Sequence, residues 1–350
     1  MIQQQNILDI LQEFNLNGKH IQYTPLTAGL INDTFLVTDD EKQQFILQRI
    51  NHIVFKNTGI LMDNINYALP YLTADDYAQI TFLPTKSGEN CLQINGDYWR
   101  IMTYIPDSTT YNTTTNTSTA FETGRIVGGF HSLLKKADVT LFKDTLPKFH
   151  HLDHRAHEFK EALATSEVDK REIAAVAIKK AHHFLKELEH LNNENLPVRI
   201  CHNDTKLNNI LFSKNSDKAL CLIDLDTIMK GYFYYDFGDA IRTVVNVAPE
   251  DEQNHDLITF NSELFEAFVD GLATNESFLT EEEKQSLPLG AVFMPFIHGL
   301  RALTDYLNNN TYYKVTYENQ NLDRCLSLFN FAEKALAKKE MMAAYIQKCL

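Results

Sequence analysis

The segment from 199 to 224 constrains the fold of this chain more than any other part. Short apolar strands are expected at 199–201 and 209–212, and a third, at 220–224, ends in Asp224. Two such strands joined by a short polar loop form a compact β-loop-β unit. The loop carries four polar side chains that could take part in catalysis or bind a ligand: His202, Asp204, Lys206 and Asn209.

Phosphoryl transfer fits the order and spacing of these residues. The reaction needs one carboxylate to orient the attacking hydroxyl, and a carboxylate and an amide oxygen to hold the metal that bridges the phosphates. We therefore assign Asp204 as the catalytic base, Asn209 and Asp224 as Mg²⁺ ligands, and Lys206 as a cation facing the phosphates. His202 belongs to the same catalytic set and is expected to brace the loop through a hydrogen bond. Singly, each carboxylate is better explained as a turn residue or a cap, but together they favour a kinase.

The rest of the chain predicts an α+β protein of two lobes, because 350 residues exceed one ordinary core. A β-rich N-lobe is expected at 1–105 and a mainly helical C-lobe at 106–350, joined by a polar linker at 107–119. Period-2 patterns predict strands at 23–26, 33–38, 44–50, 79–83, 91–95 and 99–105. Helical spacing predicts helices at 7–14, 61–69, 121–134, 156–163 and 171–191, and a helical remainder from 236.

Composition excludes several classes of partner. The formal net charge is −14 without a basic block, which argues against nucleic acid. Neither a membrane span nor a secretory leader is expected, so the predicted location is cytoplasmic. Five scattered cysteines have no zinc or redox spacing and are expected to be free thiols. Oligomeric state cannot be predicted from these features.

Several motifs give the chain a family resemblance. It resembles the aminoglycoside phosphotransferase and choline kinase superfamily, and within it the N-acetylhexosamine 1-kinases. The resemblance implies a bilobal protein-kinase-like fold that uses ATP and Mg²⁺, with nucleotide and hinge in the N-lobe and catalytic loop and acceptor site in the C-lobe. The matching segments are at 29–34, 46–51, 202–209, 222–227, 236–239 and 299–306.

The resemblance implies a phosphate-binding loop at 27–32. It contains one glycine, Gly29, so it is not a glycine-rich fingerprint. Backbone N–H groups there, with the side chains of Asn32 and Thr34, would meet phosphate oxygens. The alternative is an ordinary hairpin turn.

The third strand and the last strand of the N-lobe complete the implied nucleotide site. Arg49 occupies the position expected for the phosphate-binding cation, and Asp63 is the nearest acidic candidate to pair with it. The alternative for Arg49 is a cation at a strand edge. The backbone of Met102, Tyr104 and Ile105 would form the hinge that binds adenine.

On the acceptor side, the resemblance implies that Arg301, Asp305 and Tyr312 contact the acceptor substrate together with Asp204. Arg301 and Asp305 are four residues apart and would share one helix face, although a surface salt bridge explains the same spacing. Asp236 and Asp239 would brace the neighbouring loop or bind substrate.

A histidine-rich segment at 149–157 suggests a metal site at first sight. Asp153 is the one further ligand nearby, so an exposed turn is favoured over zinc. Cys201, beside the catalytic loop, is interpreted as an inert buried thiol and not as a nucleophile.

The predicted function is phosphorylation of the anomeric hydroxyl of an N-acetylhexosamine, an amino sugar that acts as the small-molecule acceptor. Within the same class, an aminoglycoside, homoserine or a choline-like compound is the alternative acceptor. A different class, a catalytically inactive nucleotide-binding module, is opposed by the four filled positions of the catalytic loop.

Overall fold

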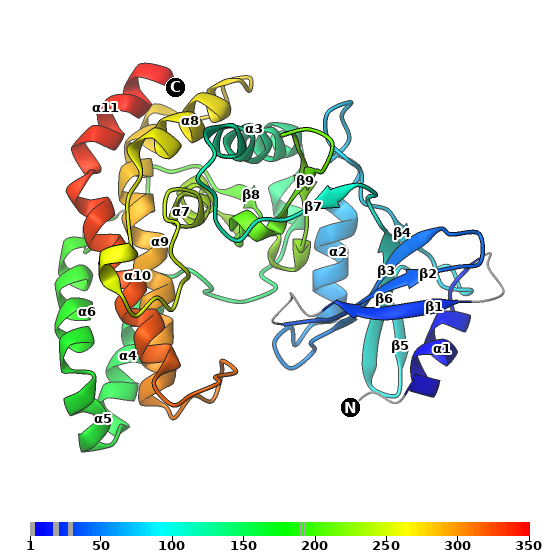
Figure 1. Cartoon of the computed structure of the whole chain (residues 1–350), viewed down its shortest axis with the longest axis horizontal. Helices are drawn as coiled ribbons and strands as arrows, with labels where there is room; N and C mark the ends of the chain where they lie inside the picture. Colours follow the sequence, from blue (N-terminus) through cyan, green and yellow to red (C-terminus); the bar gives the residue numbers. More distant parts are fainter. Residues whose placement is uncertain (1–3, 17–20, 27–30, 190, 192) are drawn as a thin grey trace.

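The first part of the chain forms an antiparallel sheet in the computed structural model, which describes residues 4–16, 21–26, 31–189, 191 and 193–350 (Figure 1). The strand order is β1-β2-β3-β6-β4, and β5 pairs with β6. The Asn95-Gly96 turn between β5 and β6 has positive φ at both residues, as the sequence predicts for a tight hairpin. The bounds are β1 Gln22–Leu26, β2 Asp33–Thr38, β3 Gln44–Ile50, β4 Phe82–Leu83, β5 Leu92–Ile94 and β6 Asp97–Thr103.

Each face of this sheet packs against one helix. On one face, α1 (Gln4–Gln12) covers a buried cluster that includes Leu47 and Trp99. On the other face lies α2 (Thr58–Ala68), whose apolar residues share a core with the helical part of the chain. Asn64 of α2 ties the two parts together, since its amide donates to the carbonyls of Lys143 at 2.7 Å and Ile228 at 2.8 Å.

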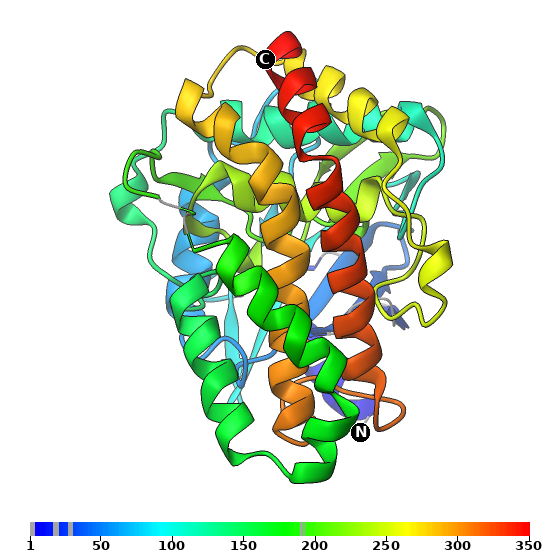
Figure 2. The same cartoon turned by 90° about the vertical axis from the view of Figure 1, so that its left-hand side faces the viewer.

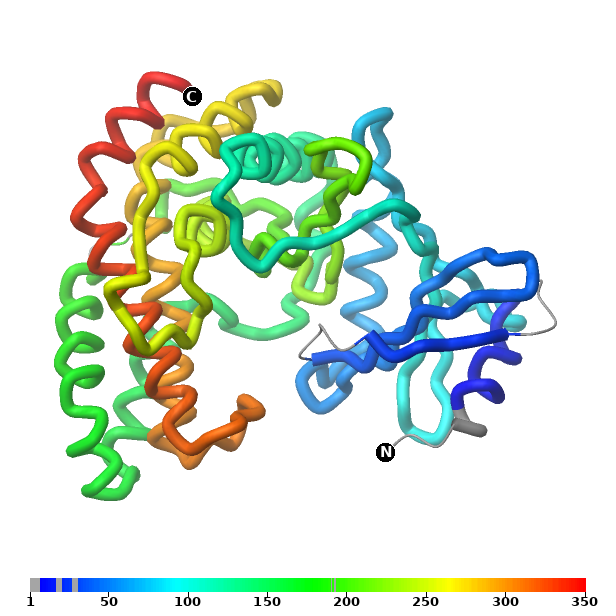
Figure 3. The backbone as a smooth tube through the Cα atoms, in the orientation of Figure 1, coloured from blue at the N-terminus to red at the C-terminus, as the bar shows by residue number. Residues whose placement is uncertain are grey.

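The second part is mainly helical and carries two small sheets, β10-β9-β7 and β11-β8. The chain enters it along an extended segment after β6, which Figure 3 shows running across to α3. The strands are β7 Ser108–Thr109, β8 Arg199–Cys201, β9 Ile210–Ser213, β10 Ala219–Leu222 and β11 Met229–Gly231. The helices are α3 Thr117–Leu134, α4 Leu152–Thr165, α5 Val168–Ile173, α6 Ala175–Glu187, α7 Phe233–Val244, α8 Ser262–Ala273, α9 Glu281–Leu307, α10 Gln320–Ala337 and α11 Lys339–Cys349.

Helix α9 is the centre of the helical part, packed between the α4–α6 layer and α10 and α11 (Figure 2). Among the described helices it is the one long and apolar enough to cross a membrane. However, 83% of that apolar stretch is buried inside the protein, as in the core helix of a globular lobe.

Helices α3 and α8 cross at close range through a pair of glycines. A Cβ built on Gly124 would lie 1.9 Å from the carbonyl oxygen of Phe268, and one on Gly271 would lie 1.9 Å from that of Phe121. Only a residue without a side chain allows this approach of two backbones.

The α+β fold class is confirmed, and β2, β3 and β8 have the predicted bounds. The other predicted bounds differ by one or more residues, and the strand predicted at 220–224 ends at Leu222 as β10, before Asp224. The last N-lobe strand, predicted at 99–105, ends at Thr103, so Tyr104 and Ile105 lie after it. The linker predicted at 107–119 includes β7 near its start and the first residues of α3 at its end. The single helix predicted at 171–191 is wrong, because α5 and α6 meet at Ala174, whose ψ of 5° interrupts the helix.

Candidate active site

The catalytic loop joins β8 to β9 and presents alternate side chains to solvent. Asp204 and Lys206 are partly exposed, whereas the intervening Thr205 is buried. The amide of Asn209 donates to Asp204 Oδ2 at 2.7 Å, and Lys206 Nζ lies 2.9 Å from the same oxygen. Asp204 Oδ1 has no partner among the described residues, so one carboxylate oxygen is free to meet a substrate hydroxyl.

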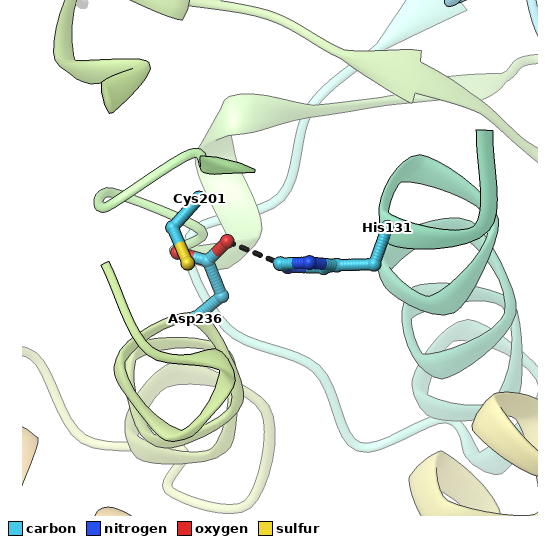
Figure 4. A group of neighbouring side chains, drawn as sticks. All are labelled: His131, Cys201 and Asp236. Carbon is cyan, nitrogen blue, oxygen red and sulfur yellow. Dashed lines mark hydrogen bonds and ion pairs between the residues drawn. The ribbon is translucent and has the colours of Figure 1, made fainter. Parts of the chain in front are cut away.

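Asp236, on α7, holds the start of this loop through its buried carboxylate. Its carboxylate accepts from the backbone N–H of His202 at 2.8 Å and of Asn203 at 2.7 Å, and its Oδ2 lies 2.8 Å from His131 Nε2. Figure 4 shows His131 reaching from α3 toward this carboxylate. Asn203 has a φ of 62°, a left-handed conformation that these bonds stabilise. Asp236 is therefore a brace of the catalytic loop; the sequence did not identify His131 as its partner.

His131, Cys201 and Asp236 also form the one group of three His, Cys, Asp or Glu side chains, in the described part of the chain, close enough to hold a metal. The group fits a metal poorly. The oxygens of Asp236 are already occupied by three donors, and burial raises the pKa of the Cys201 thiol well above its ordinary value. A cysteine binds a metal as its thiolate, and the hydrogen bonds of Asp236 to His131 and to the loop account for this cluster as a brace of the loop.

His202 links the catalytic loop to the turn that carries Asp224. Its Nε2 donates to the carbonyl of Ile223 at 2.8 Å, and its Nδ1 accepts from the N–H of Asp204 at 3.3 Å. The backbone adds a second link, because the N–H of Ile223 donates to the carbonyl of Asn209 at 2.8 Å. These contacts give His202 the bracing position predicted for it.

Asp224 stands at the start of a short 3-10 turn (Leu225–Thr227) with a φ of 61°. Burial, with the charges of Asp226 and Asp204, raises the pKa of Asp224 to about 6. A cluster of carboxylates that repel one another in this way suits a divalent cation. The oxygens of Asp224 and Oδ1 of Asn209 are hard ligands of the kind Mg²⁺ prefers, so the donor set fits this ion.

Lys206 remains a cation beside these carboxylates. Burial alone would lower the pKa of Lys206, but the neighbouring Asp204 and Asp224 raise it above its ordinary value. A lysine held charged at this position can stabilise negative charge on a phosphoryl group.

On the nucleotide side, Gly29 lies outside the described residues. The Asn32 side chain is already engaged, since its Nδ2 donates to Asp226 Oδ2 at 2.7 Å and its Oδ1 accepts from the N–H of Asn51 at 3.0 Å. The hydroxyl of Thr34 accepts from Gln48 Nε2 at 3.2 Å. Asn32 therefore bridges the expected phosphate loop to the turn that follows Asp224.

Arg49 lies on the sheet face that packs against α1 and not on the face toward the Asp224 turn, so the structure does not support the phosphate contact expected of it. Its neighbours across the ladder are Asp33 and Trp99, and Trp99 is buried against α1. The guanidinium pairs with Asp33 and lies 3.4 Å from Asp97, so Asp63 is not its partner. The reason is strand alternation: the next residue inward, Gln48, occupies the opposite face.

The hinge candidates lie where β6 leaves the sheet. Met102 pairs with Ile46 on one side and with Phe82 on the other. The N–H of Tyr104 donates to the carbonyl of Gln44 at 3.4 Å, and the carbonyl of Ile105 accepts from Ser108 at 2.6 Å. Hinge contacts to adenine therefore stay a prediction that depends on the remaining backbone groups of this segment.

Arg301, one of the expected acceptor contacts, is surrounded by aromatic rings. Its guanidinium carbon lies 4.7 Å from the ring centroid of Phe149, 5.8 Å from that of Tyr312 and 5.9 Å from that of Tyr313. Asp305 does not pair with it. The carboxylate of Asp305 accepts from the backbone N–H groups of Tyr312 at 2.7 Å and Tyr313 at 2.9 Å, so it fixes the loop that carries the two tyrosines.

The other carboxylates near this region are also paired. Asp239 is fully buried; burial would raise its pKa, but the charges of Arg242 and His298 lower it below its ordinary value. Glu250 pairs with Arg242 and with Arg324, the latter at 2.6 Å. Asp239 is therefore part of a buried ion network, which gives it a bracing position.

The histidine-rich segment resolves into separate roles. His150 is 3% exposed, and its Nε2 donates to the carbonyl of Asn203 at 3.1 Å in the catalytic loop. His151 caps α4, and His154 and His157 face Glu158 and Glu161 one turn on. Four histidines in nine residues indicated an exposed segment, so the buried position of His150 was not predicted. The signal available in the sequence is that His150 directly precedes the N-cap residue of α4.

Comparison with known proteins places this geometry in context. The model of the phosphotransferase enzyme family matches residues 22–268. A microcompartment-associated aminopropanol kinase superposes with a TM-score of 0.62 at 16% identity, covering 97% of this chain and 98% of that one. An amicoumacin kinase, solved with AMP-PNP and Ca²⁺, superposes with a TM-score of 0.61 at 17% identity, covering 96% and 93%. A choline kinase from Cryptosporidium parvum Iowa II gives 0.60 at 13% identity, covering 99% of each chain. At these identities the likeness concerns the fold.

Proposed function

The chain belongs to the phosphotransferase enzyme family, and on this premise we propose that it transfers the γ-phosphoryl group of ATP to the anomeric hydroxyl of an N-acetylhexosamine. The kinase part of the proposal is supported by the free oxygen of Asp204 beside the turn of Asp224, whose carboxylate would bind the metal. The choice of acceptor depends on one observation, the charge of Arg301 inside its three aromatic rings.

The residues of the loop would divide the reaction between them. Asp204 would accept the proton of the attacking hydroxyl, and Lys206 would stabilise charge on the transferred group. Asp224 and Asn209 would hold Mg²⁺, which neutralises the phosphates when it is bound. An anomeric hydroxyl is more acidic than an ordinary alcohol, so a carboxylate base suffices for it.

The surroundings of Arg301 favour a neutral acceptor over a cationic one. Three aromatic rings could hold a ligand ammonium ion, but the protein's own guanidinium already occupies them. No carboxylate pairs with Arg301 in the described part of the chain. Two neighbouring histidines, His150 and His298, have lowered pKa values. Burial is the main cause in both, and the positive charge of Arg301 contributes.

An acetamido sugar suits this charge pattern. The guanidinium can donate hydrogen bonds to a carbonyl oxygen, and exposed Tyr312 offers a ring surface to a sugar. An amine-bearing acceptor would meet excess positive charge in the same place. Aminoglycosides and choline-like compounds are therefore the less favoured acceptors, and homoserine, which is zwitterionic, lies between.

A matched pair of sugars tests the acceptor. We would measure ADP release with MgATP and either N-acetylglucosamine or glucosamine, which differ in the acetyl group and hence in charge. Kanamycin, choline and homoserine complete the panel, and phosphorus NMR of the product identifies the phosphorylated position. Turnover of N-acetylhexosamines with anomeric phosphate is the expected result. A preference for glucosamine, kanamycin or choline would contradict the acceptor, and MgATP binding without turnover of any compound would favour the inactive module.

Substitution of Arg301 sharpens the same test. R301M should lower kcat/KM for N-acetylglucosamine by about tenfold, the equivalent of ~1.4 kcal/mol, and narrow its preference over glucosamine. R301K keeps the charge and should preserve the rejection of glucosamine. If R301M leaves the ratio between the two sugars unchanged, Arg301 does not select the acceptor.

A further inference from the structure

A row of polar side chains crosses three strands on the sheet face opposite α1. Thr34, Gln48 and Arg100 are direct neighbours across β2, β3 and β6. Gln48 joins the row: its Nε2 donates to the Thr34 hydroxyl at 3.2 Å, and its Oε1 accepts from Arg100 Nε at 3.1 Å and Nη2 at 2.8 Å. Arg100 thus presents its charge on the face opposite the one that carries Arg49.

Arg100 reaches from this sheet to the turn that carries Asp224. Its side chain is 2% exposed, and Nη2 lies 2.5 Å from Asp226 Oδ1. Nη1 lies 3.9 Å from the sulfur of Met62 on α2, and the ring of Phe82 covers the guanidinium at 5.7 Å. A buried guanidinium in this setting has a fixed position, because it cannot move without leaving an unpaired charge in an apolar environment.

Asp226 receives a second contact from the N-terminal sheet. Its Oδ2 accepts from Asn32, the last residue of the expected phosphate loop, directly before β2. Both oxygens of Asp226 are therefore directed at the N-terminal part of the chain, while its backbone belongs to the 3-10 turn directly after Asp224. Asp226 is 2% exposed and stands two residues from the proposed metal ligand.

We propose that Arg100 is a positioning residue for the metal–nucleotide site: through Asp226 it holds the Asp224 turn against the sheet and keeps Asp226 from acting as a competing ligand. The inference rests on the proposed use of MgATP, and it does not depend on the identity of the acceptor. A single cation of β3, Arg49, was expected to face the phosphates; on the sheet face toward Asp224 the structure has Gln48 and Arg100 instead. Outer contacts that orient a metal ligand commonly change metal affinity by about 10- to 100-fold when they are removed.

Calorimetry separates this role from a contact with the nucleotide itself. We would titrate the wild type and R100M with ATP, once with excess Mg²⁺ and once with EDTA, and measure Mn²⁺ binding by electron paramagnetic resonance. R100M should weaken MgATP binding by about 10- to 100-fold and change metal-free ATP binding by less than about threefold. Equal weakening of both forms would assign Arg100 to the phosphates, and no change in either would make it structural; each result overturns the proposal.

Two further variants keep the test decisive. R49M is the matched control, because Arg49 lies on the opposite face of the same sheet, and it should leave MgATP affinity unchanged. If R100M does not fold, D226N removes the partner charge at nearly constant shape and should show the same selective loss of MgATP and Mn²⁺ affinity. Retained metal affinity in D226N would refute the role of the pair.

The proposed function fails by a different measurement. A wild-type protein that binds no MgATP would refute nucleotide use as a whole. A wild type that binds MgATP but turns over no hexosamine would refute the acceptor alone, and the comparison of R100M with R49M would still stand.

Discussion

Replacement of Asp236 by asparagine tests whether the catalytic loop depends on a buried carboxylate. Asp236 is fully buried and receives three donors at 2.7–2.8 Å, from the backbone of His202 and Asn203 and from His131. Asparagine has the same shape but replaces one acceptor oxygen with a donor. Whichever way the amide turns, at least one backbone N–H of the loop then faces an N–H group.

The structure sets the size of the effect. Loss of one hydrogen bond to a charged acceptor contributes about 1.5–3 kcal/mol, and a buried N–H without a partner adds about 1–3 kcal/mol. Removal of a buried negative charge offsets part of this sum. We expect D236N to lower the free energy of unfolding by about 3 kcal/mol, a large share of the roughly 5–15 kcal/mol typical of a folded protein. A loop displaced by ~1 Å should also reduce kcat by about 10²-fold.

Urea denaturation followed by tryptophan fluorescence and circular dichroism measures the stability, and the ADP-release assay measures kcat. The matched control is D217N, since Asp217 is exposed in the turn between β9 and β10 and should change neither quantity. A loss below ~1 kcal/mol together with an unchanged kcat would show that Asp236 does not hold the loop, and the reasoning from its three donors would be refuted.

Three further predictions concern other parts of the protein. D204N should reduce turnover by about 10²–10⁴-fold with MgATP affinity preserved, and near-normal turnover would remove Asp204 as the base. Burial and the neighbouring His298 lower the pKa of His150 well below its ordinary value, so the free energy of unfolding should fall as the pH drops below about 6.5, where the unfolded chain takes up the proton. H150Q should reduce this dependence of stability on pH, and an unchanged dependence would contradict the assignment. G124A should destabilise the α3–α8 crossing by about 1–3 kcal/mol or more, whereas G129A, whose Cβ would meet nothing closer than 3.6 Å, should be neutral or stabilising; equal effects of the two in thermal melts would refute the close approach.

The catalytic loop could be predicted because its residues are constrained locally. The polar positions at 202–209 are set by chain spacing between two short strands, and no distant residue is needed to place them in one loop. The same holds for the Asn95-Gly96 hairpin, whose residues favour the positive φ that the turn requires.

The sequence of β3 does not tell which of its side chains face the nucleotide site. Its apolar residues lie on both faces, because Leu47 packs toward α1 and Ile50 toward the helical part, so alternation alone does not tell which face meets the nucleotide. The error over Arg49 follows directly. Arg100 gave a usable signal, a charged residue in the middle of an apolar strand, which is stable only with a buried partner.

Asp305 shows a second limit of spacing arguments. Its distance of four residues from Arg301 predicted a shared face, yet its carboxylate turns to the backbone of the following loop. Two N–H groups at 2.7 and 2.9 Å satisfy both oxygens without a cation, and the loop that provides them is far from obvious in the sequence.

The carboxylates around the catalytic loop differ in how many partners they have, and this difference separates structure from chemistry. Asp226, Asp236 and Asp239 are buried and each has at least two polar partners; both oxygens of Asp226 and Asp236 are engaged, whereas the two partners of Asp239 share Oδ1. Asp204 keeps one free oxygen, and Asp224 has no hydrogen-bond partner in the described part of the chain while remaining partly exposed. The like charges of Asp226 and Asp204 beside Asp224 favour a cation at that position, and the free oxygen of Asp204 can accept a hydrogen bond from a hydroxyl. The bracing residues thus leave Asp204 and Asp224 available, and these are the two acidic groups that the proposed phosphoryl transfer would use.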